Sequence, residues 1–117
     1  MKGIIVIKER DKAREILNVL MKYYVVHQFS DVNANISISN NSTDIIIKGK
    51  VDPGLVDIAE IKNVLSHPRM REYDDYYEGL LESSDQQEFT AIGYLVDESM
   101  VNLKNDILAI KITRYHI

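Results

Sequence analysis

The spacing of apolar and polar positions along this chain changes between the period of a strand and the period of a helix. The run "GIIVI" at residues 3–7 is short, unbroken and mostly β-branched, which is typical of a strand buried on both faces. From Asp11 the apolar spacing becomes helical, and Asp11 itself is a suitable N-cap. We therefore predict a strand at residues 3–7 and a helix that begins at Asp11 and ends near Val25 or Val26.

Residues 34–51 have the pattern of a β-hairpin. The segment "ANISIS" places Ala34, Ile36 and Ile38 on one face and polar residues on the other, as in a half-solvated strand. The next residues, "NNST", favour a turn, and "DIIIKGKV" at residues 44–51 resumes the strand period. The pattern predicts two strands joined by a turn.

Two helices are predicted next. Asp52 and Pro53 are suitable for the N-cap and the first position of a helix that runs to Leu65. Pro68 starts a second helix, which contains "REYDDYYEGLL" at residues 71–81. In both helices the apolar residues recur at helical spacing. The expected buried positions are Leu55, Ile58, Ile61 and Leu65 in the first helix and Met70, Tyr73, Tyr77, Leu80 and Leu81 in the second.

The segments "FTAIGYLV" (residues 89–96) and "DILAIKITRY" (residues 106–115) have the pattern of two final strands, joined by a loop at residues 97–105. The expected order is strand, helix, strand, strand, helix, helix, strand, strand. Because strands and helices interleave without regular alternation, we predict an α+β fold in which helices cover one face of a mainly antiparallel sheet of about five strands. The opening order resembles the ferredoxin-like arrangement. No linker divides the sequence, so a single domain over residues 1–117 is expected.

The composition of the chain disfavours several classes of partner and of chemical site. The formal net charge of −4 disfavours general affinity for a nucleic-acid backbone, and the sequence contains no cysteine for a disulfide, a thiolate metal site or a nucleophile. No apolar run approaches the roughly 18 residues of a membrane span, and the start of the sequence turns polar too soon for a secretory signal. We therefore expect a cytoplasmic protein without a membrane partner.

The sequence contains no residue pattern that we assign to catalysis, to a metal or to a cofactor. His27, His67 and His116 occur in none of the ligand spacings of zinc enzymes. Asp74 and Asp75 are adjacent, so they diverge by about 100° on a helix and cannot form a carboxylate pair. The glycines are scattered and form no phosphate-binding loop. We therefore expect a protein that is not an enzyme.

The charge distribution favours the second predicted helix as a binding surface. Residues 71–88 carry seven acidic side chains and one basic one, whereas residues 1–22 carry six basic side chains and three acidic ones. A solvated helix face usually mixes charges, and tyrosine beside carboxylates suits protein interfaces. We predict an interaction or regulatory domain whose acidic helix binds a basic protein surface or a second copy of the chain. The predicted contact residues are Glu72, Asp75, Tyr76, Glu78 and Glu82.

Several alternatives remain open at this point. The acidic face could be no more than solvated surface. A pocket between sheet and helices could hold a small ligand or a substrate, with His67, Asp97 or Glu98 and a tyrosine as its polar groups. Lys48, Lys50 and the first helix could contact nucleic acid, or the carboxylates could imitate a nucleic-acid backbone in an inhibitor.

Overall fold

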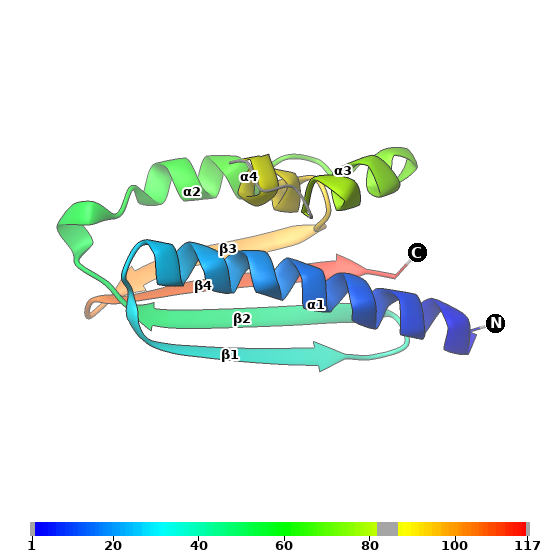
Figure 1. The fold of residues 1–117 in the computed structure, drawn as a ribbon, viewed down its shortest axis with the longest axis horizontal. Coiled ribbons are helices and arrows are strands. Elements are labelled where there is room, and N and C mark those ends of the chain that lie inside the picture. The colour runs from blue at the N-terminus through cyan, green and yellow to red at the C-terminus, as the bar shows by residue number, and fades with distance from the viewer. Residues whose placement is uncertain (1, 82–86, 117) are drawn as a thin grey trace.

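The structure is a computed structural model that describes residues 2–81 and 87–116, with side chains for residues 7–81 and 89–116. It contains one antiparallel sheet with helices lying over one of its faces (Figure 1). The first described element is α1 (Lys2–Val26), the longest of the described helices, which runs along the sheet (Figure 1). Soon after α1 ends, Gln28 adopts a left-handed conformation with φ of 61°, which turns the chain toward the sheet.

The sheet consists of four antiparallel strands. They are β1 (Ser30–Ile38), β2 (Ser42–Lys50), β3 (Glu98–Lys104) and β4 (Ile107–Tyr115), in the order β1-β2-β4-β3. Consecutive strands form the two hairpins, and the central pair of β2 and β4 joins them. In that pair Ile45 lies opposite Ile112, and Ile47 lies opposite Ile110. Because directly opposite residues share a face, these isoleucines all lie on the same side of the sheet.

The chain between the two hairpins forms the remaining helices. They are the 3-10 turn η1 (Pro53–Leu55), α2 (Ile58–Leu65), the 3-10 turn η2 (Arg71–Tyr73), α3 (Asp74–Leu81) and α4 (Gln87–Gly93). In Figure 1 α2, α4 and α3 form a row on the same side of the sheet as α1. Since α1 contacts β1 and β2 while α2 contacts β3, the helices cover both halves of this face. No helix in the described part of the chain covers the opposite face.

The core lies between the helices and the sheet. Its largest fully buried side chains include Ile16, Leu20, Tyr24, Ile45, Ile92, Leu108 and Ile110. The Tyr24 hydroxyl donates to the backbone oxygens of Leu108 at 2.9 Å and Ile47 at 3.3 Å, so its polar end is satisfied inside the core. Burial raises the pKa of this hydroxyl, which therefore keeps its proton as a donor. A Cβ at Gly49 would lie 2.7 Å from the Tyr24 ring, so close packing requires glycine there.

The α+β class with an antiparallel sheet is confirmed, but the predicted five strands and the ferredoxin-like order are not found. Residues 2–81 and 87–116 form four strands, and the first element among them is a helix instead of a strand. The predicted strand at residues 3–7 is wrong, because these residues belong to α1. No proline or glycine separates them from the helical pattern that follows, and a short apolar run fits a helix as well as a strand.

The prediction for residues 89–105 is also wrong. The segment "FTAIGYLV" begins within α4, and β3 occupies the predicted loop. A Cβ at Gly93 would lie 2.0 Å from the backbone oxygen of Val64, so only a glycine allows α4 to approach the chain there. In β3, Ser99, Val101 and Leu103 are partly buried while their neighbours are exposed, which is the pattern of a half-solvated strand.

The helix predicted from Asp52 is divided into two elements. Asp52 caps only η1, where its carboxylate accepts from a backbone amide at 3.0 Å, and α2 begins later with Asp57 as its N-cap. Leu55, expected in the core, belongs to η1 and is 78% exposed, so this prediction is wrong. Ile61 and Leu65 are buried as predicted, since they lie within α2.

Candidate functional site

The predicted contact residues lie in η2 and α3, which follow each other directly. The side of α3 that faces the rest of the molecule carries Asp74, Tyr77 and Leu81, at the spacing of one helix face. Tyr73 and Met70, which are predicted in the core, are 51% and 41% exposed, so the prediction is wrong for both. The helix is turned so that Asp74 lies inward, where two arginines pair with it.

Asp74 lies between two buried guanidinium groups. Arg69 donates from Nη2 to Asp74 Oδ2 at 2.8 Å and from Nε to Oδ1 at 3.3 Å. Arg114 donates from Nη2 to Asp74 Oδ2 at 2.9 Å. Burial alone would raise the pKa of Asp74, but the hydrogen bonds and charges of the two arginines outweigh burial and lower this pKa. Asp74 is therefore an ionised carboxylate with a structural role.

Arg114 connects α3 to α1 through the sheet. Its guanidinium donates to both carboxylate oxygens of Glu9 in α1, at 2.7 and 3.3 Å, and to the backbone oxygen of Leu95 at 2.7 Å. Arg114 and Glu9 are 2% and 5% exposed. Sequence reasoning misses this pair, although the strand period of β4 places Arg114 on its inward face. A charged residue at an inward strand position is a signal that could have indicated a buried ion pair.

Arg69 fixes the chain just before η2. It donates to Asp97 Oδ2 at 2.7 Å and to the backbone oxygen of Tyr115 at 2.8 Å. Asp97 also accepts from the Tyr115 amide at 2.6 Å, and Glu98 accepts a hydrogen bond from the Tyr115 hydroxyl. Within the described part of the chain, neither carboxylate is hydrogen-bonded to His67, the proposed polar group of a ligand pocket.

The other predicted acidic residues differ in their surroundings. Glu72 and Asp75 are exposed, and neither forms a hydrogen bond or an ion pair with any residue the structure describes. Glu78 is partly buried and pairs with Lys12 of α1 at 3.6 Å, so it supports the contact between α3 and α1. Glu82 lies outside the described residues. The outward carboxylates of this segment are therefore Glu72 and Asp75.

Tyr76 projects from α3 and is supported by a row of packed rings. It is 63% exposed, and its ring meets Tyr77 edge-on with a centroid distance of 5.1 Å. Tyr77 stacks on Tyr94 at 4.4 Å, and Tyr94 stacks on His67 at 4.7 Å. Gly79 lies about one turn further along α3, and a Cβ there would meet no atom within 4 Å. The Tyr77 ring therefore supports one side of the Tyr76 ring, and the surface of α3 at Gly79 is not covered by other described residues.

The histidines belong to different parts of the chain, and none pairs with a carboxylate among the described residues. His27 Nδ1 lies 2.8 Å from the backbone oxygen of Tyr23. His116 is buried, and its Nε2 lies 2.7 Å from Thr43 Oγ1. Within residues 7–81 and 89–116, no group of three or more His, Cys, Asp or Glu side chains could hold a metal ion. The described histidines therefore have packing and hydrogen-bonding roles.

Lys48 and Lys50 lie on the open face of the sheet. Lys48 is opposite Ala109, and Lys50 is opposite Ile107. The cross-strand pairing places further charges of both signs on this face, namely Lys104, Lys111, Asp44 and Glu98. Because its charge is mixed, this face does not single out a nucleic-acid backbone as its partner.

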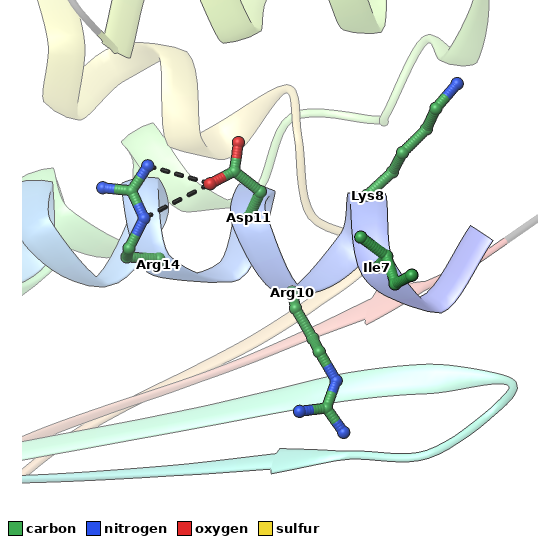
Figure 2. Close-up of a pocket in the computed structure, with 5 residues that line it drawn as sticks. All are labelled: Ile7, Lys8, Arg10, Asp11 and Arg14. Carbon is green, nitrogen blue, oxygen red and sulfur yellow. Dashed lines mark hydrogen bonds and ion pairs between the residues drawn. The ribbon is translucent and has the colours of Figure 1, made fainter. Parts of the chain in front are cut away.

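A hollow, called the α1 hollow below, lies on the outer side of α1 (Figure 2). It has a volume of about 510 Å³ and is lined by Ile7, Lys8, Arg10, Asp11 and Arg14. Ile7 is 68% exposed, and Arg14 donates a hydrogen bond of 2.9 Å to Asp11. In Figure 2 Lys8 and Arg10 extend from α1 in opposite directions. Lys8 and Arg10 therefore place one cationic side chain on each side of the hollow.

Comparison with known proteins finds no matching family model, no matching curated protein and no matching solved structure. None of the helices in residues 2–81 and 87–116 combines the length and the apolar composition needed to cross a membrane. The function is therefore inferred from the contacts and surfaces of this chain.

Proposed function

We propose that this chain is a protein-interaction domain that binds a basic protein surface through η2 and α3, in the cytoplasm. The binding residues are Met70, Glu72, Tyr73, Asp75 and Tyr76, and together they are called the α3 surface. The main support is the exposure of Tyr73 and Tyr76, at 51% and 63%, beside two outward carboxylates.

Exposed tyrosines with this spacing favour an interface over a simple solvated face. A tyrosine buries a large, rigid ring at low conformational cost, and Tyr and Met are enriched in interfaces. Tyr73 at the end of η2 and Tyr76 in α3 are three residues apart, so helical spacing places them on neighbouring positions of one side, and Met70 is the residue directly before η2. A partner that covers these side chains removes apolar surface from water, which stabilises the complex.

The α3 surface is held in position before a partner binds. Behind it, Arg69 and Arg114 bind Asp74, and the Tyr76 ring packs against Tyr77. A surface with ordered supports loses less conformational entropy on binding than a mobile one. The buried ion pairs therefore assist binding although they do not contact the partner.

Glu72 and Asp75 determine which charge the partner should carry. Two exposed carboxylates attract a basic surface, speed its encounter and disfavour acidic partners. Charges at the rim of an interface are screened beyond about 10 Å at 0.1 M salt. The association rate should therefore fall as salt rises.

Two matched tyrosine variants test this function. Tyr76→Ala removes a ring from the α3 surface, and Tyr115→Ala removes a 43% exposed ring from the open face of the sheet. A partner captured by the wild-type chain is identified and purified, and its Kd is measured for all three chains. Tyr76→Ala should raise the Kd by at least about tenfold, whereas Tyr115→Ala should change it by less than about twofold. Equal affinities for the two variants would refute the proposal.

A further inference from the structure

We infer that the partner of the α3 surface is a second copy of this chain, whose α1 hollow receives it. This inference rests on the proposed function, because it assigns a partner to the same surface. The charges of the two surfaces and the open depression on α1 support it.

The α1 hollow is a shallow, largely open depression on one helix, so an aromatic ring can lie on it without being enclosed. Its volume is about 510 Å³, and its lining includes the apolar Ile7, which is 68% exposed. Tyr76 is a ring with 63% of its surface exposed, and buried tyrosines are common anchors of interfaces. Arg10 and Arg14 line the hollow, and a guanidinium group binds favourably to the face of an aromatic ring. The acidic group of the lining, Asp11, is already hydrogen-bonded to Arg14.

The charges of the two surfaces are opposite. Lys8 and Arg10 form no hydrogen bond or ion pair with any residue in the described ranges. Glu72 and Asp75 on the α3 surface are equally without such a contact there. Pairing these groups between two copies would give each charge a partner that it lacks among the described residues of its own chain. It would also steer the encounter of the two copies.

Both surfaces face away from the core on the same layer of the molecule. At about 100° per residue, Ile7 lies about 160° around α1 from the buried Glu9, and Tyr76 lies about 160° around α3 from the inward Asp74. Since α1 and α3 contact each other, with Lys12 paired to Glu78, the two surfaces belong to neighbouring helices of this layer. A two-fold axis between facing helix layers would place each α3 surface on the α1 hollow of the other copy. Both contacts would form together, which gives a closed dimer.

Exchange of charges between the two surfaces tests this arrangement. One variant carries Glu72→Lys and Asp75→Lys, and the other carries Lys8→Glu and Arg10→Glu. Each variant alone places like charges opposite each other in both contacts of a dimer. In an equal mixture, the reversed α3 surface meets the reversed α1 hollow, and the two unchanged surfaces meet each other. Both contacts are then attractive again.

Sedimentation velocity over a range of protein concentrations measures the result. We expect a wild-type dimer, a dimer Kd raised at least about tenfold in each variant, and a heterodimer in the mixture. A chain with all four substitutions keeps the net charge of −4 and should dimerise like wild type. The control variant carries Lys48→Glu and Lys50→Glu on the open face of the sheet. It changes the net charge as much as the variant with Lys8→Glu and Arg10→Glu does, and it should remain a dimer.

Carbodiimide cross-linking, which joins a carboxylate to an amine in direct contact, locates the interface. Unlabelled and isotope-labelled wild-type chains are mixed before the reaction. Links from Glu72 or Asp75 to Lys8 should join chains of different label. The pair of Lys12 and Glu78, 3.6 Å apart within one chain, provides a reference link that should stay within one label.

The possible results separate this inference from the proposed function. A wild-type chain that is monomeric at every concentration overturns the dimer, while the Tyr76→Ala measurement on another partner still decides the proposed function. A monomeric mixture, or an α1 variant that dimerises as wild type does, also overturns the dimer. Assemblies larger than a dimer that Lys48→Glu and Lys50→Glu abolish would overturn it too, because they assign the contact to the open sheet face. Agreement of all chains with the expected pattern would support it.

Discussion

Loss of the Asp74 charge should destabilise the fold strongly. In Asp74→Asn the side chain keeps its size, but the negative charge between Arg69 and Arg114 disappears. Those two arginine side chains are only 5% and 3% exposed, and each would lose one of its two carboxylate partners while keeping the other, Asp97 for Arg69 and Glu9 for Arg114. Because both arginines keep a carboxylate partner, the loss should be about 1.5 to 3 kcal/mol, the range for hydrogen bonds to charged groups.

Urea denaturation measures this loss, with tyrosine fluorescence as the signal because the chain has no tryptophan. For a slope of about 2 kcal/mol per molar, the midpoint should fall by about 1 M. Asp75→Asn is the matched control, since it neutralises the adjacent, exposed carboxylate. It should change the free energy of unfolding by less than about 0.5 kcal/mol.

The same substitution should change how stability depends on pH. The folded protein lowers the pKa of Asp74, so the stabilisation is complete above the unfolded pKa of about 3.9 and is lost as pH falls through the lower, folded pKa. Wild type should therefore lose stability more steeply than Asp74→Asn between about pH 5 and pH 2. A cost below about 1 kcal/mol, an unchanged acid slope, or an equal cost for Asp75→Asn would refute the structural role of this carboxylate.

The remaining predictions concern packing and use the same denaturation assay. Gly49→Ala places a methyl group 2.7 Å from the Tyr24 ring and should cost about 1 to 3 kcal/mol, so an unchanged midpoint would contradict the close contact. Gly79→Ala fills open space within α3 and should add about 0.5 to 1 kcal/mol of stability, so a loss would show that this face is covered. Leu20→Ala should cost about 2 to 5 kcal/mol, whereas Leu55→Ala, at a position 78% exposed, should cost less than about 0.5 kcal/mol, and equal costs would contradict the assigned core.

Strands were predictable where β-branched residues follow the strand period, strictly in the segment "ANISIS" and with consecutive apolar residues in β2 and β4. The turn between β3 and β4 also carries a local signal, although sequence reasoning misses it. Asn105 and Asp106 adopt φ of 53° and 64°, and residues of these types favour two-residue hairpin turns. A search for the strand period on both sides of Asn105 and Asp106 would have predicted β3 as the strand before this turn. The apolar run at residues 3–7 offered no such signal, because its pattern fits either element.

The candidate site was predictable only in part. Composition located the acidic, tyrosine-rich helix, but it could not determine which side of the helix is buried. That choice depends on Asp74, whose arginine partners Arg69 and Arg114 are brought to it by the tertiary fold. Helical spacing alone cannot show which of two neighbouring faces of a helix is buried when both faces contain tyrosine. Tyr73 is therefore exposed against expectation, while the partner contacts of Glu72, Asp75 and Tyr76 stay predictions.

The central position of β4 has a consequence for the order in which the chain is made. β4 is the last of the four strands to leave the ribosome, and until then the inner edge of β2 has no hydrogen-bonding partner. α1 also cannot complete its contacts before β4 is made, because Tyr24 donates to the backbone oxygen of Leu108 and Glu9 accepts from Arg114, and both partners lie on β4. A nascent chain therefore exposes an unpaired apolar strand, which is the kind of edge that aggregates. Protection of that edge during synthesis should therefore raise the yield of this protein.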